Sequence, residues 1–340
     1  MALLEMMIYV DKSKYFAWKS YRTHPPVTYV SREKAQLCHF IGRVPKDNTK
    51  PFIKEIEHIL YVPGMSRNCT RRLKAAPRME QEFRSINCKA IFCPTDRILS
   101  QVARYINTSG MEDKLHLVHL AYSDQPDNLH EQTGPFTILT ISNRFWGRGI
   151  ALAIEVFRIL RKKYGQDVRM RLVCDNVPAD YPLVEGLELI RVHRLSSQLR
   201  YKLYREANVF LLLCLMPFGA VLETMAHGVP TVLTPTGGWI LPGQTGLIVE
   251  PPFSMYDEGF GIEWKTYNQF CGIVKTRFER GDLSYMITEA VTHVEFLMNN
   301  LDRLKQMGRV AQKRQREQFS FQSRNEQVRQ IYARILKQIP

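Results

Sequence analysis

The chain has 340 residues, of which 45% are hydrophobic, and its formal net charge is +14 at pH 7. This length exceeds that of one ordinary domain and predicts two, each able to bury a substantial core. The longest apolar run is far shorter than the roughly 20 residues of a membrane span. Met1–Met7 also lacks the basic and apolar regions of a secretory leader, so we expect a cytoplasmic protein.

The positive charge predicts attraction to polyanions. Three partners fit it: nucleic acid, anionic lipid headgroups, or a negatively charged small substrate. Nucleic acid is the least expected, because the basic residues are not interleaved with aromatic residues in any RNA-binding or helix-turn-helix pattern. The densest basic cluster, between Arg67 and Arg78, fits either a solvated helix face or a peripheral contact with an anionic membrane surface.

The seven cysteines form no Cys-x-x-Cys pair, and no histidine stands at metal-ligand spacing from them. This pattern favours free thiols in a reducing compartment and predicts no metal site. Cys214 lies inside an apolar run and is expected in the core.

Regular patterns are sparse in the first half of the chain, residues 1–125, which we expect to form one domain. The predicted strands there are 59–62, 89–94 and 115–120, and the predicted helix is 96–105. Residues 123–134 are rich in Asp, Gln, Pro and Asn, which predicts a linker after this domain.

Strands and helices alternate through the second half. A predicted strand at 137–142 is followed by a loop that contains Gly147 and Gly149 and by a helix at 150–163. Further strands are expected at 170–174, 187–192, 209–215 and 231–234, with a helix at about 199–207 and a short one ending at Gly228. This alternation predicts a parallel, doubly wound α/β sheet over residues 135–318. Helices at 283–297, 300–318 and from 319 to about 337 complete the chain.

Residues 217–230 read Pro-Phe-Gly-Ala-Val-Leu-Glu-Thr-Met-Ala-His-Gly-Val-Pro. They follow an apolar strand, begin with a glycine turn and continue into a short helix. Gly228 and Pro230 are typical of a helix end. A strand, a glycine turn and a helix N-terminus in this order predict an anion-binding crevice.

Several motifs in this order resemble one family, the nucleotide-sugar-dependent glycosyltransferases of the GT-B fold, and among them the retaining family four, or glycosyl transferases group 1. The motifs are Asn143–Gly149, Ile154–Phe157, Leu222–Pro230, Gly237–Gly238, Gly243–Val249 and the region from Gly308 to Phe321. The similarity extends from about Lys89 to the end of the chain.

The resemblance implies two Rossmann-like domains that face a cleft. The acceptor-side domain, residues 1–125, would be divergent and abbreviated, and residues 135–318 would bind the nucleotide sugar. The C-terminal helix, residues 319–340, would pack back toward the N-terminal domain.

The implied activity is a hexosyltransferase-type reaction of glycan biosynthesis. A nucleotide-diphosphate sugar would be the donor substrate, with no separate cofactor and no metal, and the anomeric configuration would be retained. The acceptor would be a glycan, a lipid-linked molecule or a small molecule.

The resemblance assigns the donor diphosphate to Arg144 and Arg148. A guanidinium is always ionised and offers forked donors to phosphate, so it can stabilise the charge that builds on the leaving oxygen. The alternative is that both are solvated loop arginines.

Glu223 would accept hydrogen bonds from the two ribose hydroxyls, a task that suits a carboxylate. Its alternative role is to stabilise the dipole of the helix in whose first turn it lies. The resemblance adds further donor contacts, mainly through backbone groups, at Arg194, Leu195, Met216, Phe218, Gly219, Ala220 and Thr224.

Two departures leave a second function open. The family usually has another glutamate before the position of Glu223, where this chain has Leu215 or Met216. A histidine that often follows the middle strand of the N-terminal domain is replaced by Pro63-Gly64, and His58 is a poor substitute. The alternative to an enzyme is therefore a non-catalytic relative that binds a nucleotide sugar or a partner enzyme. The retained Glu223 and arginine pair favour the enzyme.

Overall fold

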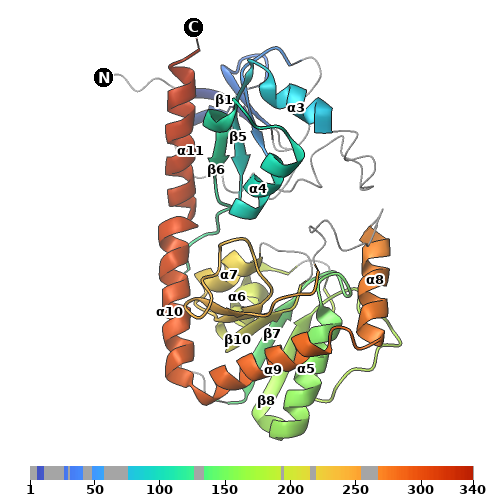
Figure 1. Cartoon of the computed structure of the whole chain (residues 1–340). Coiled ribbons are helices and arrows are strands. Elements are labelled where there is room, and N and C mark those ends of the chain that lie inside the picture. The colour runs from blue at the N-terminus through green and yellow to red at the C-terminus, as the bar shows by residue number, and fades with distance from the viewer. Residues whose placement is uncertain are drawn as a thin grey trace. The chain divides into compact units, whose positions relative to one another are not determined.

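The structure is a computed structural model, and it describes residues 6–10, 27–29, 31–40, 48–56, 76–125, 134–192, 195–214, 220–253 and 267–339. The chain divides into two compact units. Unit 1 comprises Met1–Ser123 and Glu317–Pro340, and unit 2 comprises Asp124–Arg316. Each unit is built on its own six-stranded sheet (Figure 1).

The sheet of unit 1 is parallel and has the strand order β2-β1-β3-β4-β5-β6. Its strands are β1 (Met6–Val10), β2 (Val27–Tyr29), β3 (Leu37–Phe40), β4 (Phe52–Glu55), β5 (Cys88–Cys93) and β6 (Leu115–Leu117). Helices α3 (Ala76–Arg84) and α4 (Asp96–Tyr105) pack on one face of this sheet through residues such as Phe83 and Val102. The C-terminal helix α11 (Phe321–Leu336) packs on the other face through residues such as Val328 (Figure 1). Unit 1 therefore has three layers.

Buried charges join α11 to this sheet. Arg324 Nη2 donates to Glu55 Oε1 at 2.7 Å, and both side chains are 1% exposed. The other oxygen of Glu55 lies 3.1 Å from His39 Nε2, and His39 Nδ1 lies 2.7 Å from the hydroxyl of Tyr332. Arg324 also donates to the carbonyls of Val118 and His119. Paired and hydrogen-bonded in this way, the charges can be buried between a helix and a sheet.

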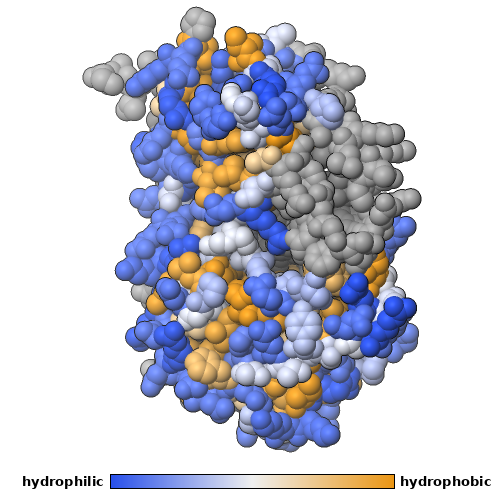
Figure 2. Space-filling model, in the orientation of Figure 1, coloured by the Kyte–Doolittle hydropathy of each residue, from blue (hydrophilic) through white to orange (hydrophobic). Residues whose placement is uncertain are grey.

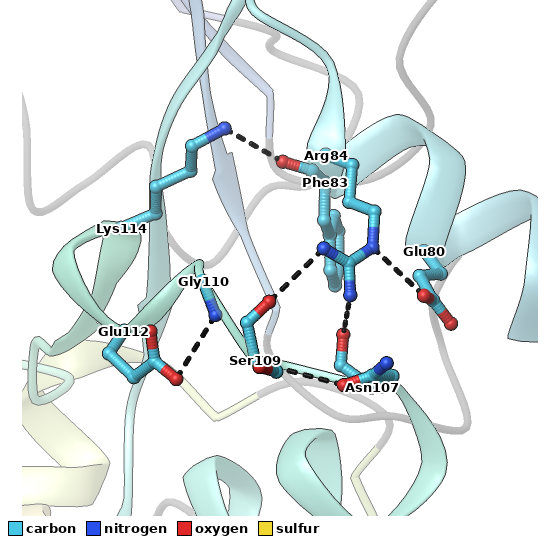
Figure 3. A network of polar contacts seen from close by, with 8 residues as sticks. All are labelled: Glu80, Phe83, Arg84, Asn107, Ser109, Gly110, Glu112 and Lys114. Carbon is cyan, nitrogen blue, oxygen red and sulfur yellow. Dashed lines mark hydrogen bonds and ion pairs between the residues drawn. The ribbon is translucent and has the colours of Figure 1, made fainter.

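A second polar network fixes the loop after α4, as Figure 3 shows. Arg84, in the last turn of α3, donates to the carbonyls of Asn107 and Ser109 at 2.9 and 3.1 Å and to Glu80 at 2.9 Å. Lys114 donates to the carbonyl of Phe83 at 3.1 Å. One helix end therefore holds the turn that leads into β6.

The sheet of unit 2 is also parallel and has the strand order β12-β11-β10-β7-β8-β9. Its strands are β7 (Phe136–Ile141), β8 (Val168–Val173), β9 (Leu187–Ile190), β10 (Val209–Leu212), β11 (Thr231–Leu233) and β12 (Gly246–Ile248). The helices are α5 (Ile150–Tyr164), α6 (Ser197–Arg205), α7 (Ala220–Ala226), α8 (Tyr267–Glu279), α9 (Ser284–Asn299) and α10 (Leu301–Gln318). The prediction of a parallel, doubly wound sheet is confirmed.

The predicted elements of the second half each match an observed element within a few residues. Strand β10 is shorter than predicted and ends at Leu212, although Leu213 and Cys214 after it are buried as expected. In the first half, the predicted helix 96–105 is α4, and the strands at 89–94 and 115–120 correspond to β5 and β6. The strand predicted at 59–62 lies outside the described residues. Strands β1 to β4 and helix α3 were not predicted.

Hydrophilic residues cover much of the face that Figure 2 shows, and hydrophobic residues lie among them. Within the described ranges, no helix is both long enough and apolar enough to cross a bilayer. The six cysteines in these ranges are free thiols, and burial raises the pKa of Cys88 to about 12.

Candidate functional site

The candidate site of unit 2 lies where the order of the strands reverses. From β7 the chain continues to β8 and β9 on one side, and then crosses to β10, β11 and β12 on the other. In an open parallel sheet, ligands bind outside the carboxyl ends of the strands at such a switch point. Here that point lies between β7 and β10, which pair directly. The residues that follow these two strands are therefore the first candidates for ligand contacts.

A tight loop, residues 142–149, follows β7. The backbone N–H of Arg144 donates to Ser142 Oγ at 3.3 Å, and the N–H of Arg148 donates to the carbonyl of Arg144 at 3.2 Å. Gly149 closes the loop with a φ of +66° and starts α5. The loop therefore keeps its two arginines on one turn of chain at the positive end of a helix dipole. Arg144 is exposed and Arg148 is partly buried.

This loop lies directly against the end of β10. A Cβ added to Gly149 would be 1.8 Å from the carbonyl oxygen of Leu213, so only a glycine fits there. The thiol of Cys214 lies 3.8 Å from the carbonyl of Gly147. The backbones of the segments after β7 and β10 are thus in direct contact.

Aromatic rings fix the middle of the same loop. The ring of Trp146 makes edge contacts with Phe145, Tyr181 and Phe278 at centroid distances of 5.0, 6.1 and 5.7 Å. Lys275 of α8 lies over the Trp146 ring at 5.8 Å. Trp146 stands between Arg144 and Arg148 in the sequence, so this packing restrains the loop that carries both arginines.

Glu223 lies in α7, on the other side of the switch point. Its side chain is 12% exposed, and its two oxygens accept hydrogen bonds from α6. Arg200 Nη1 donates to Oε1 at 3.0 Å, and the Tyr204 hydroxyl donates to Oε2 at 3.1 Å. Tyr204 in turn stacks on the ring of His227, with centroids 4.8 Å apart and planes 15° apart. The carboxylate is therefore held from one side by a cation and a phenol.

Helix α10 supports α7 from behind. Gln312 Nε2 donates to the carbonyl of Ala226 at 2.9 Å. A Cβ on Gly308 would lie 2.2 Å from the carbonyl oxygen of Gly228, so the helix backbone touches the turn that ends α7. This contact gives the Gly308 motif of the sequence a structural role.

The same helix fixes the loop after β11. Arg314 donates to the carbonyls of Gly238 and Trp239 at 3.0 and 3.2 Å. Arg303 donates to the carbonyl of Gly243 at 2.7 Å. The Gly237–Gly238 and Gly243 motifs are therefore held by arginine side chains of α10.

Four of the residues predicted to contact the donor, Arg194, Met216, Phe218 and Gly219, lie outside the described residues. Leu195 is partly buried just before α6, and Ala220 is the buried first residue of α7. Thr224 is fully buried, and its hydroxyl donates to the carbonyl of Val221 at 2.7 Å. Its side chain therefore has a partner inside the helix.

The sequence interpretation did not identify Arg200 and Tyr204. They stand four residues apart on a helix that was predicted, so they share one face of it. This spacing was the one feature of the sequence that could have indicated that the two side chains act together. Within the described part of the chain, no cluster of three or more His, Cys, Asp or Glu residues could hold a metal ion.

Comparison with known proteins places this site in context. Residues 135–257 match the family model described as Glycosyl transferases group 1, a segment that contains Arg144, Arg148 and Glu223. The resemblance seen in the motifs is thereby confirmed for this segment. Among curated proteins, no sequence matches the chain.

Solved structures share the fold at low sequence identity. A glycosyltransferase from Rickettsia africae ESF-5 is 15% identical with a TM-score of 0.60, and the match covers 90% of this chain and 78% of that one. Sucrose-phosphate synthase from Thermosynechococcus elongatus is 14% identical with a TM-score of 0.60, covering 92% and 82%. Anabaena Alr3699/HepE, solved in complex with UDP-glucose, is 15% identical with a TM-score of 0.53, covering 89% and 79%. The chain therefore has the GT-B fold.

Proposed function

We propose that this protein is a glycosyltransferase that moves a sugar from a nucleotide-diphosphate donor to an acceptor. The observation that carries the proposal is the meeting of two segments at the switch point of unit 2. The loop with Arg144 and Arg148 touches the end of β10, and α7 with Glu223 follows β10 in the chain. The match to the glycosyl transferases group 1 model over the same residues supports it.

The diphosphate and the ribose of the donor would be bound by protein side chains of opposite charge. Arg144 and Arg148 would hold the diphosphate, because guanidinium groups make forked, charge-assisted hydrogen bonds to phosphate oxygens. Glu223 would accept hydrogen bonds from the ribose hydroxyls. We take UDP as the first probe, since Anabaena Alr3699/HepE was solved with UDP-glucose.

During transfer, the bond between the anomeric carbon and the diphosphate oxygen breaks with its electron pair on that oxygen. The acceptor oxygen bonds to the carbon and gives its proton to the departing diphosphate. Negative charge then grows on the leaving diphosphate. The two arginines would stabilise the transition state more than the bound donor, since fixed positive charges directed at a developing anion lower the energy barrier. We propose that they replace a metal ion in this role and that the anomeric configuration is retained.

The acceptor is a lipid-linked or otherwise anionic glycan, because a protein with a net charge of +14 attracts anionic molecules. Peripheral attachment to an anionic membrane from the cytoplasmic side is part of this proposal. Sedimentation with vesicles of anionic lipid, compared with neutral vesicles, tests it. Equal recovery with both kinds of vesicle would contradict it.

The function itself is tested by donor turnover. The purified chain is incubated with a panel of UDP-, GDP- and ADP-sugars, with and without glycan, lipid and alcohol acceptors, in the presence of a chelator. Release of the nucleoside diphosphate, and a product with the donor's anomeric configuration, are expected. Tight nucleotide binding without turnover across the panel would instead support a non-catalytic nucleotide-sugar-binding protein.

A further inference from the structure

Two side chains of α6 contact the carboxylate of Glu223, and the sequence motifs do not include them. Arg200 and Tyr204 each donate to a different oxygen of Glu223, at 3.0 and 3.1 Å. The three side chains differ in exposure: Tyr204 is fully buried, Glu223 is 12% exposed and Arg200 is 33% exposed. The carboxylate is therefore mostly buried, with a small part of the Glu223 side chain still exposed to solvent.

We propose that Arg200 and Tyr204 are positioning residues that hold Glu223 ready for the two hydroxyls of a ribose, an inference that rests on the proposed function. An ionised carboxylate has about four acceptor sites on its two oxygens. The two bonds from α6 use one site on each oxygen. Because each oxygen is fixed by a donor of its own, the carboxylate is held in one orientation, and its two oxygens match a pair of neighbouring hydroxyls.

The arrangement also lowers the cost of ordering the side chain. A free glutamate loses up to about 2 kcal/mol of rotamer freedom when it is fixed. Here that freedom is already lost before a ligand arrives, because the partners of Glu223 are themselves held. Tyr204 stacks on His227 at 4.8 Å, and Tyr201 makes an edge contact with the same ring at 5.6 Å.

Charge gives Arg200 a second effect. A lone carboxylate near a diphosphate would repel it, and the repulsion is larger where water is partly excluded. The ion pair with Arg200 offsets the negative charge of the Glu223 carboxylate. Arg200 therefore allows a carboxylate to bind ribose without weakening the attraction between the arginine loop and the diphosphate.

The test measures the affinity of UDP, GDP and ADP for the wild-type chain by calorimetry, and then uses the tightest binder with each variant. Arg200→Gln and Tyr204→Phe should each weaken binding roughly tenfold, because each removes one hydrogen bond to a charged group. Lys202→Gln, on an exposed position of the same helix, is the matched control and should leave the affinity unchanged.

A positioning role also predicts that the loss of affinity depends on the ribose hydroxyls and on Glu223. Against the 2′,3′-dideoxy form of the same nucleotide, which has no hydroxyls for Glu223, Tyr204→Phe should bind as the wild type does. Arg200→Gln should lose less affinity for the dideoxy form than for the full nucleotide, because only its effect on the diphosphate remains. In a Glu223→Ala background, Tyr204→Phe should cause no further loss. Thermal unfolding of each variant confirms that the fold is retained.

The outcomes separate the two claims. If the wild type binds a nucleotide and Glu223→Ala weakens binding, but Arg200→Gln and Tyr204→Phe do not, the positioning role is overturned and the proposed function stands. An equal loss with the dideoxy nucleotide also overturns it. If the wild type binds none of the three nucleotides, the proposed function fails and the inference fails with it.

Discussion

Gly149 lies against the carbonyl oxygen of Leu213, so close that a Cβ on the glycine would be 1.8 Å from that oxygen. This contact joins the loop after β7 to the end of β10. It places the loop that carries Arg144 and Arg148 against Leu213, which precedes α7 in the chain. The contact is between backbone atoms, so no change of side-chain rotamer can relieve a substitution at Gly149.

Gly149→Ala should therefore destabilise unit 2 by about 2–5 kcal/mol, the sum of a left-handed backbone cost and an overpacking cost. The measurement is urea unfolding followed by tryptophan fluorescence. Gly281→Ala is the matched control, because Gly281 has a φ of +81° with nothing within 4 Å of the added Cβ. It should cost only about 1–2 kcal/mol. Equal losses in the two variants would show that the contact with Leu213 is not tight.

Arg148→Gln should weaken the binding of UDP by roughly ten- to a hundredfold, since it removes a charged donor to phosphate. The affinity for uridine, which has no phosphate, should not change. Calorimetry with the two ligands at low and high salt measures both effects. Arg158→Gln, on the partly exposed side of α5, is the control and should bind UDP as the wild type does. A parallel loss of uridine affinity would indicate that Arg148 acts through the fold and not through the diphosphate.

Arg324→Leu should destabilise unit 1 by about 3–5 kcal/mol, because it leaves the buried Glu55 without its cation. Arg329→Leu, on the same helix, is the matched control. Arg329 pairs with Glu326, and both side chains are 47% exposed, so its loss should cost at most about 1 kcal/mol. Thermal unfolding of both variants makes the comparison. Similar shifts in the two midpoints would mean that the buried pair does not fix α11 to the sheet.

His116 gives a prediction for pH. Burial and the nearby Arg334 lower the pKa of His116 below its ordinary value of 6.5, while Asp113 opposes the shift. Arg334 Nη2 lies 3.0 Å from His116 Nε2, an arrangement that suits the neutral ring. The folded state therefore binds this proton less well than the unfolded state. The contribution of the neutral His116 ring to the stability of the fold is present above the pKa of the unfolded state. It is lost as the pH falls through the pKa of the folded state.

Arg334→Gln should raise the pKa of His116 and make this loss of stability on acidification smaller. An NMR titration of the His116 ring measures the pKa directly. An unchanged or lower value in the variant would rule out Arg334 as a cause of the shift.

Five of the six strands of unit 2 could be predicted, because most of their residues are apolar and the strands end at glycine or polar turns; β12 was not predicted. Strands β3 and β4 could not. Their sequences, Leu-Cys-His-Phe and Phe-Ile-Lys-Glu, include three polar side chains that are buried: His39, Lys54 and Glu55. Two of the partners that make this burial tolerable, Glu82 and Arg324, are distant in the sequence. A pattern of hydropathy counts such residues as exposed.

The candidate site shows the same limit. Arg144, Arg148 and Glu223 were identified because they lie in motifs that resemble a family. Arg200 and Tyr204 stand 23 and 19 residues before Glu223, and only the packing of α6 on α7 brings them to its carboxylate. Spacing on a helix could show that they share a face, but not which residue that face meets.

The central claim is that unit 2 binds a nucleotide diphosphate with Glu223 on its ribose. The most direct measurement is a calorimetric titration of UDP into the wild-type chain, into Glu223→Ala and into the control Glu185→Ala, whose side chain is 93% exposed. We expect binding by the wild type and by Glu185→Ala, and a loss of about 1.5–3 kcal/mol in Glu223→Ala. Unchanged affinity in a folded Glu223→Ala variant would contradict the account.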